Sequence, residues 1–270
     1  MTLSRPRVSA LLREHGIAPS RALGQNFLVD PNTARRIARL AGVGPGDRVV
    51  EVGPGLGSLT LALLDAGANV RAVELDRRLA AVLADVTEGR CEIIVGDALE
   101  VDLAALCDAP GTKVVANLPY NVAVPIVVRF LEEAPNAASQ FVMVQAEVAQ
   151  RLAAAPGDAA YGAVSVKVAY HAAASLAGKV PRTVFLPEPN VDSMLASIVR
   201  RDHVAVDPAD VAEARLFEVV RSAFAHRRKM LRRSLDGIVA PEAYERAGVA
   251  PTQRPEELDV AAFGRLAARP

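Results

Sequence analysis

Short apolar runs alternate with longer amphipathic stretches between about residues 48 and 145 of this chain. The apolar runs have the length of buried strands and occupy residues 48–52, 70–73, 92–95, 114–116 and 140–144. Helical periodicity fills the intervals between them, at residues 58–66, 77–86 and 122–133. Strands separated by helices of this length predict a parallel sheet covered on both faces, and therefore an α/β fold.

The flanking segments follow other patterns. Asp30 and Pro31 predict an N-cap and first turn, which begin a helix that runs towards Leu40. The prolines at 183–189 disfavour a central strand, whereas residues 191–200 again have a strand pattern. From Asp207 onward the chain is helical, with one apolar face made of Leu216, Val219, Val220, Ala223 and Phe224. We therefore expect a main domain at 1–203, with a basic N-terminal arm at 1–22, and a small all-helical domain at 204–270.

The amino-acid composition of the chain limits the class of protein to which it can belong. The chain has 270 residues and is 51% hydrophobic, which is ample for a full core, yet no uncharged apolar run reaches membrane-spanning length. The N-terminal basic residues precede no apolar secretory core, and the two cysteines, Cys91 and Cys107, form no cluster. We therefore expect a cytoplasmic protein without a membrane partner. The histidines show no metal-ligand spacing, so no metal is expected.

Charge is unevenly distributed although the net charge is zero. Six arginines and lysines and no acid lie between Arg221 and Arg233. Their spacing predicts one helix, on which Arg228 and Arg232 share a face. A run of charge is often only a solvated helix face, but an acid-free run also suits phosphate contacts on RNA. The candidate RNA-binding residues are Arg221, Arg227, Arg228, Lys229 and Arg232, and the basic residues at 5–21 offer a second contact.

A glycine-rich loop, Glu51–Gly57, joins the first predicted strand to its helix. Glycines at this position allow the backbone to approach a ligand at a helix N-terminus. The dinucleotide fingerprint requires G-x-G-x-x-G, whereas this loop reads G-x-G-x-G. The spacing argues against NAD and favours a nucleoside ligand without a pyrophosphate, although a plain tight turn is the alternative.

Acids at the ends of the next two strands extend this site. Glu74 ends the second strand, where a carboxylate can accept both hydroxyls of a ribose. Asp97, between Gly96 and Ala98, ends the third strand and can accept from an adenine amine. Either acid alone is more often a surface carboxylate, but acids at successive strand ends together indicate a nucleoside site.

The stretch Asn117–Tyr120 follows the fourth predicted strand. It offers a side-chain amide, a backbone carbonyl, a rigid bend and an aromatic face, a set that suits a flat ring bearing an amine. Pro119 has no N–H and restricts Leu118 to extended conformations, which keeps the Leu118 carbonyl available. The alternatives are an ordinary turn amide for Asn117 and core aromatic side chains for Tyr120 and Phe185.

These stretches, together with Gly24–Leu28, Phe185–Ser193 and Arg227–Lys229, resemble the ribosomal RNA adenine N6-dimethyltransferases. The resemblance implies a Rossmann-like class I methyltransferase sheet and the cofactor S-adenosylmethionine. It implies that Asn26 and Leu28 fold over the cofactor. It further implies that Gly53 and Gly55 contact the methionine end of the cofactor and that Glu74 contacts the ribose. The remaining implied contacts, around the adenine and the methyl donor, are made by Asp97, Ala98 and Asn117.

The same resemblance implies the reaction. Asn117 and Leu118 would present two acceptors to the adenine N6 hydrogens, while Tyr120 and Phe185 cover the two faces of a base turned out of the RNA. The implied substrate is a pair of adjacent adenosines in a 3′-terminal hairpin of small-subunit 16S rRNA, within an assembling 30S particle. The sequence departs from the family's commonest pattern at Ala146 and Asn190, where lysines are expected, so RNA contacts there are reduced.

Other functions remain open at this point. An NAD-dependent oxidoreductase is disfavoured by the glycine spacing and leaves Asn117–Tyr120 without a role. A non-catalytic ribosome-assembly or RNA-binding factor has no need of Asn117, Glu74 and Asp97. Within the methyltransferases, an enzyme that acts on large-subunit rRNA and confers antibiotic resistance is the nearest alternative. The oligomeric state and the order of the two transfers are not encoded in these patterns.

Overall fold

The computed structural model describes residues 3–20 and 24–268, and it divides the chain into two compact units. The first unit comprises Met1–Ala149 and Ser175–Val199, and the second comprises Gln150–Ala174 and Arg200–Pro270. The sequence placed only 204–270 in the second domain. Residues 150–174 pack with it as well, because Tyr161, Val166 and Tyr170 belong to its apolar core.

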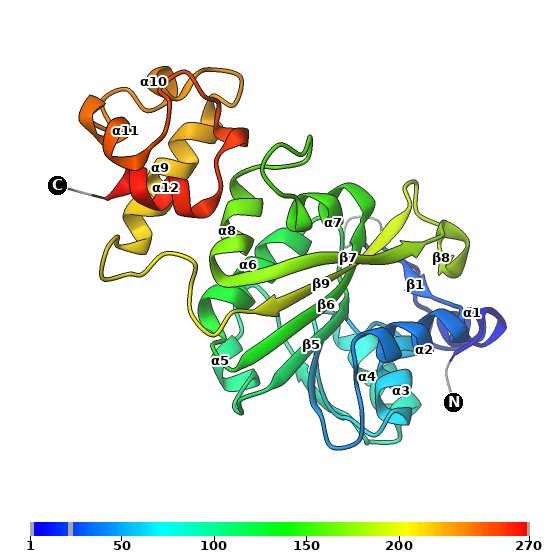
Figure 1. Ribbon diagram of the computed structural model, residues 1–270. Coiled ribbons are helices and arrows are strands. Elements are labelled where there is room, and N and C mark those ends of the chain that lie inside the picture. The colour runs from blue at the N-terminus through cyan, green and yellow to red at the C-terminus, as the bar shows by residue number, and fades with distance from the viewer. Residues whose placement is uncertain (1–2, 21–23, 269–270) are drawn as a thin grey trace. The chain divides into compact units, whose positions relative to one another are not determined.

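A seven-stranded sheet runs through the first unit, in the order β4-β3-β2-β5-β6-β9-β7. Its strands β5, β6, β9 and β7 lie side by side in Figure 1. Strands β2 to β6 pair in parallel, and β9 pairs antiparallel with β6. The strand order reverses between β2 and β5, and such a switch point is where open α/β sheets bind ligands. The bounds are β2 Arg48–Val52, β3 Asn69–Glu74, β4 Glu92–Val95, β5 Thr112–Asn117, β6 Ala137–Gln145, β7 Ala172–Val180 and β9 Ser193–Arg200.

The predicted helices of the sheet domain are confirmed. They are α2 Pro31–Leu40, α3 Ser58–Asp65, α4 Arg77–Thr87 and α6 Ala123–Glu133. Asp30 caps α2 as expected, since its carboxylate accepts from the backbone N–H groups of Asn32 and Thr33. The fold is therefore the predicted α/β class with a Rossmann-like sheet.

Several elements were not predicted. They are α1 Arg5–Glu14, α5 Leu103–Leu106, α7 Ala146–Ala153, α8 Ala163–His171 and strand β7. The sequence predicted a basic arm at 1–22, but residues 5–14 of this segment form helix α1. The apolar side chains of α1 are buried in a cluster of the first unit, and they are Val8, Leu11 and Leu12. The segment has four apolar positions, Val8, Ala10, Leu11 and Leu12, among three arginines, and this pattern is too weak to predict a helix.

A two-stranded ribbon joins the N-terminal segment to the proline-rich segment. Strand β1 (Phe27–Leu28) pairs antiparallel with β8 (Phe185–Leu186), with Leu28 opposite Phe185. Arg5 stabilises this ribbon, since its Nη2 donates to the carbonyl of Thr183 at 2.6 Å and to that of Phe185 at 3.1 Å. The prolines keep this segment out of the main sheet, as predicted.

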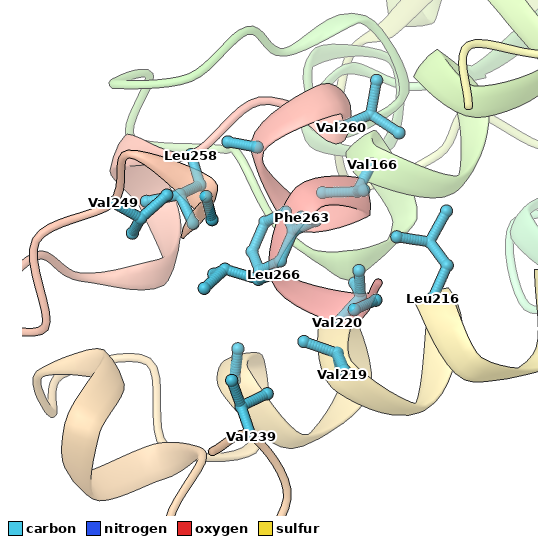
Figure 2. Close-up of a cluster of buried hydrophobic side chains, with 14 of the residues drawn as sticks. Val166, Leu216, Val219, Val220, Val239, Val249, Leu258, Val260, Phe263 and Leu266 are labelled. Carbon is cyan, nitrogen blue, oxygen red and sulfur yellow. The ribbon is translucent and has the colours of Figure 1, made fainter. Parts of the chain in front are cut away.

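The second unit is held by a helical core (Figure 2). Its remaining helices are α9 Glu213–Ala225, α10 Leu231–Ser234, α11 Pro241–Ala247 and α12 Val260–Ala267. The predicted apolar face of α9 is buried, except that Phe224 is only partly covered. Phe263 and Leu266 of α12 lie in the same core, and Tyr161 donates from its hydroxyl to the Leu258 carbonyl at 2.8 Å.

Helices of the described segments are all too short or too polar to cross a lipid bilayer. Both cysteines are buried free thiols.

Candidate active site

A cavity lies at the carboxyl ends of β2, β3, β4 and β5, around the switch point of the sheet. The structure brings nearly all of the predicted cofactor and catalytic residues to its wall. They are Asn26, Leu28, Gly53, Gly55, Glu74, Asp97, Ala98, Asn117, Leu118 and Tyr120. Phe185 is the exception among the predicted residues.

The glycine loop and the N-terminal segment form one side of the cavity. Gly55 has a φ of +59°, a conformation that disfavours any side chain. A Cβ at Gly55 would also lie 3.0 Å from the Phe27 ring, which is too close. The loop therefore needs glycine there both for its turn and for its contact with the Asn26–Leu28 segment.

Glu74 is fixed at the end of β3 by two backbone bonds. Its Oε2 accepts from the Gly55 N–H and its Oε1 from the Asp76 N–H, both at 3.0 Å. The side chain is buried, and burial raises its pKa above the usual range against the effect of these bonds. Each oxygen retains further acceptor capacity, which a pair of ribose hydroxyls can use.

Asp97 occupies a tight turn after β4. Its Oδ1 accepts from the Leu99 N–H at 2.8 Å, which leaves Oδ2 as the oxygen for a ligand. Gly96 and Ala98 line the cavity on either side of it. Asp97 therefore lines the cavity, and its contact with an adenine amine stays a prediction.

Glu51 is a cavity residue to which the sequence assigned no role. It is 1% exposed, and its Oε2 has no hydrogen-bond partner among the described residues. Burial, and secondly the nearby Glu74 charge, raise its pKa to about 8. The position of this acid before the first glycine was visible in the sequence, but its complete burial was not.

This burial predicts a pH-dependent stability for the ligand-free protein. Between pH 4.5 and 8, folded Glu51 keeps a proton that the unfolded chain has released, so the free energy of unfolding falls as pH rises through this window. Glu51→Gln removes that fall. We expect the variant to gain roughly 1–3 kcal/mol relative to the parent between pH 5 and pH 8, measured by urea unfolding.

The exposed Glu245 provides the control for this measurement. Glu245→Gln changes the formal charge equally but removes no buried carboxylate, so its stability should follow the parent at both pH values. Parallel pH profiles for Glu51→Gln and the parent would show that Glu51 is not the group responsible.

Asn117, at the end of β5, has its amide oriented by the N-terminal segment. Its Nδ2 donates to the Asn26 carbonyl at 3.2 Å, so Oδ1 remains as an acceptor. The Leu118 N–H donates to the Met143 carbonyl at 3.1 Å, while the Leu118 carbonyl receives no bond from the described residues. The site therefore offers two oxygen acceptors on consecutive residues.

Tyr120 forms an aromatic part of the wall. Its hydroxyl shares a 2.7 Å hydrogen bond with Oγ of Ser193, a fully buried residue at the start of β9. Burial raises the Tyr120 pKa, and the Ser193 bond opposes that shift. The bond fixes the position of the hydroxyl end of this half-buried side chain.

Phe185 does not face the cavity, contrary to the expectation. Its side chain is fully buried in an apolar cluster with Leu28, Ile37 and Leu195. Pairing of β8 with β1 turns the ring into the core, a consequence of strand register that its motif did not reveal.

The basic run of the second unit also differs from its prediction. Helix α9 ends at Ala225, residues 226–229 form a turn, and α10 begins at Leu231, so Arg228 and Arg232 do not share one helix face. The bond from the Leu231 N–H to the Gln253 carbonyl fixes the new chain direction. The run contains no glycine or proline, so its pattern did not predict this break.

The members of this basic run have different surroundings. Arg227 is partly buried, and it donates to the Ala159 carbonyl at 2.9 Å and lies 3.9 Å from Oε2 of Glu256. Arg227 therefore has a structural role in its unit. The exposed members, hereafter the basic turn, are Arg221, Arg228, Lys229, Arg232 and Arg233.

Comparisons of this chain with known proteins find relatives that are named as rRNA methyltransferases. The family described as ribosomal RNA adenine dimethylase matches residues 19–269. "Ribosomal RNA small subunit methyltransferase A" of Leifsonia xyli is 52% identical, over 94% of this chain and 93% of its own. The protein of the same name from Thermobifida fusca is 48% identical, over 96% and 93%.

Solved structures show the same architecture. A dimethyladenosine transferase from Plasmodium falciparum superposes with a TM-score of 0.76 at 22% identity, over 89% of this chain and 95% of that chain, and so shares the fold. The 23S rRNA methyltransferase ErmE superposes with a TM-score of 0.70 at 27% identity, over 90% and 98%.

Proposed function

Because this chain belongs to the ribosomal RNA adenine dimethylase family, we propose that it transfers methyl groups from S-adenosylmethionine to adenine N6 in small-subunit 16S rRNA. The observation that carries this proposal is the pair of acceptors, Asn117 Oδ1 and the Leu118 carbonyl, on the wall of a cavity that also holds Glu74 and Asp97. The small-subunit enzymes are about half identical to this chain, whereas ErmE is 27% identical. The relatives therefore favour the small subunit over the large one.

The cavity residues fit S-adenosylmethionine. Its ribose hydroxyls match the fixed carboxylate of Glu74, and its adenine amine matches Oδ2 of Asp97. The pKa of buried Glu51, about 8 in the ligand-free protein, should fall when a cofactor that bears a sulfonium and an ammonium group binds beside it, and the side chain then becomes an anion that favours this cofactor. When bound, the cofactor supplies an activated methyl group with a neutral leaving group.

The protein's part of the reaction is to make the N6 amine nucleophilic and to hold it in place. The N6 lone pair is delocalised into the adenine ring. Two oxygens that accept from the amine hydrogens favour a pyramidal nitrogen, which localises the pair towards the methyl donor. Tyr120 supports one face of the base, and no dedicated strong base is required because positioning and electrostatics lower the barrier.

A second transfer to the same nitrogen changes these bonds. Monomethyl adenine has one N–H left, so one of the two acceptors loses its partner. Family membership supports dimethylation, and we propose that the pair of adjacent adenosines in a 3′-terminal hairpin is the target.

The exposed cations of the basic turn suit contacts to RNA phosphates, which position an enzyme without reading sequence. We propose that these contacts are made to rRNA in an assembling 30S particle in the cytoplasm. That no metal takes part stays a prediction.

Mapping methyl groups on both rRNAs tests this function. Purified protein and labelled S-adenosylmethionine are incubated with unmethylated 30S particles, naked 16S rRNA and 50S particles, and the labelled nucleosides are identified by mass spectrometry. We expect N6,N6-dimethyladenosine in 16S rRNA alone. Label in 23S rRNA would indicate the large-subunit enzyme, and cofactor binding without any transfer would indicate a non-catalytic assembly factor.

A further inference from the structure

Arg129, on helix α6, bonds to the turn that follows β4. Its Nη1 donates to the Ala98 carbonyl at 2.8 Å and its Nη2 to the Val101 carbonyl at 3.2 Å. These residues are about thirty positions away in sequence, so the contacts are tertiary and connect a helix to a cavity loop. Arg129 itself does not line the cavity, whereas Val122 and Ile126 near the start of the same helix do.

The turn that Arg129 holds is the one that presents Asp97. Within it, the Asp97 carbonyl accepts from the N–H groups of Glu100 at 2.8 Å and Val101 at 2.9 Å. Its Oδ1 accepts from Leu99, as described above. These internal bonds shape the turn but do not attach it to the rest of the protein. The bond from the Gly96 N–H to the Glu74 carbonyl at 3.0 Å attaches the start of the turn to β3, and the two carbonyls that accept from Arg129 attach the rest of it to α6.

Glu133 aims the guanidinium of Arg129 at these carbonyls. Arg129 donates from Nε to Oε1 of Glu133 at 2.8 Å and from Nη2 to Oε2, in an i,i+4 pair on the same helix. The Arg129 side chain is 19% exposed, and its two bonds to the carbonyls are partly buried, whereas its bonds to Glu133 are exposed to water. A planar guanidinium held by a carboxylate loses little further freedom when it binds two carbonyls.

We propose that Arg129 is a positioning residue that fixes Asp97 and thereby sets the preference of the cofactor site for an adenine base. This inference rests on the proposed function, in which Asp97 accepts from the adenine amine. Without Arg129 the turn would keep its internal bonds but would move relative to α6, so Oδ2 of Asp97 would no longer be held at one distance from the base.

The test compares two ligands that differ only at one edge of the purine, in the C6 group from which Asp97 is proposed to accept and in the proton on the neighbouring N1. S-Adenosylhomocysteine carries the amine, and S-inosylhomocysteine carries an oxo group, an acceptor that opposes a carboxylate. The protein without substitutions should bind the adenosyl ligand with a Kd about ten-fold or more below that of the inosyl ligand, measured by calorimetry. Arg129→Ala should lower this ratio by about three-fold or more, and Glu133→Gln should lower it less.

Arg215 provides a matched control in the second unit. It pairs with Glu218 at 2.7 Å in an i,i+3 pair and donates to the Ile238 carbonyl at 2.5 Å, so it makes the same kinds of bond far from Asp97 in sequence. Arg215→Ala should destabilise the protein without changing the ratio of the two Kd values. Because the ratio is taken within one folded sample, a general loss of stability does not alter it.

Asp97→Asn separates the inference from its premise. The asparagine Oδ1 can keep the bond to Leu99, while its Nδ2 donates to the oxo group, so the ratio should fall towards one or below. A parent-like ratio in Arg129→Ala with a collapsed ratio in Asp97→Asn would overturn the role of Arg129 alone. A parent-like ratio in Asp97→Asn would overturn the adenine contact of Asp97 and the inference with it.

Discussion

Asn117→Ala is expected to lower kcat for methyl transfer by about a hundred- to a thousand-fold, because it removes one of the two acceptors that act on the N6 amine. The Kd for S-adenosylhomocysteine should change by less than about three-fold, since the carboxylates of Glu74 and Asp97, which we propose bind the nucleoside, remain. The measurement is single-turnover transfer of labelled methyl to unmethylated 30S particles, with calorimetry for the cofactor.

Asn136 is a suitable control for this substitution. Like Asn117, it is partly buried and donates from Nδ2 to a backbone carbonyl, that of Cys107 at 3.0 Å, but it does not line the cavity. Asn136→Ala should keep near-normal kcat. If Asn117→Ala transfers methyl groups at a comparable rate to Asn136→Ala, the acceptor role of Asn117 is refuted.

The site residues that could be placed from the sequence are those at the carboxyl ends of strands. A strand pattern fixes which residue comes last, and parallel strands end at the same edge of a sheet. Glu74, Asp97 and Asn117 were therefore placed together from spacing alone, and the structure puts all three on one cavity. The α/β class followed from the same alternation of strands and helices.

Features that depend on tertiary contacts were not predictable. The burial of Phe185 follows from the pairing of β8 with β1, two strands of two residues each that are far apart in the chain. The break between α9 and α10 depends on a bond from Leu231 to Gln253. Arg129 is an ordinary helix residue by pattern, and only its bonds to Ala98 and Val101 connect it to the site.

The boundary between the units illustrates the same limit. No low-complexity linker separates residues 150–174 from the preceding strands and helices, so the sequence assigned them to the sheet domain. Their apolar side chains nevertheless complete the helical core of the second unit, where Tyr170 packs edge-on against Phe217 with ring centroids 5.3 Å apart. Periodicity identifies an apolar face but does not say which partner covers it.

The double reversal Arg228→Glu/Lys229→Glu should weaken binding to rRNA by about ten-fold or more at low salt, because two cations of the basic turn become anions beside phosphates. If each contacts one phosphate, the slope of log K against log salt should become shallower by about 1.4 to 1.8. Cofactor binding should be unchanged. Titrations of a labelled rRNA fragment at several salt concentrations provide the measurement.

The double reversal Arg39→Glu/Arg246→Glu separates local contact from overall charge. Both arginines are exposed and lie outside the basic turn, and their reversal changes the net charge by the same amount. Long-range attraction depends on total charge and would weaken equally in both double variants, whereas ion release depends on cations that touch phosphates. If both double variants lose the same affinity and keep the slope of log K against log salt, the RNA does not contact Arg228 and Lys229. If only Arg228→Glu/Lys229→Glu changes this slope, the RNA contacts these two residues.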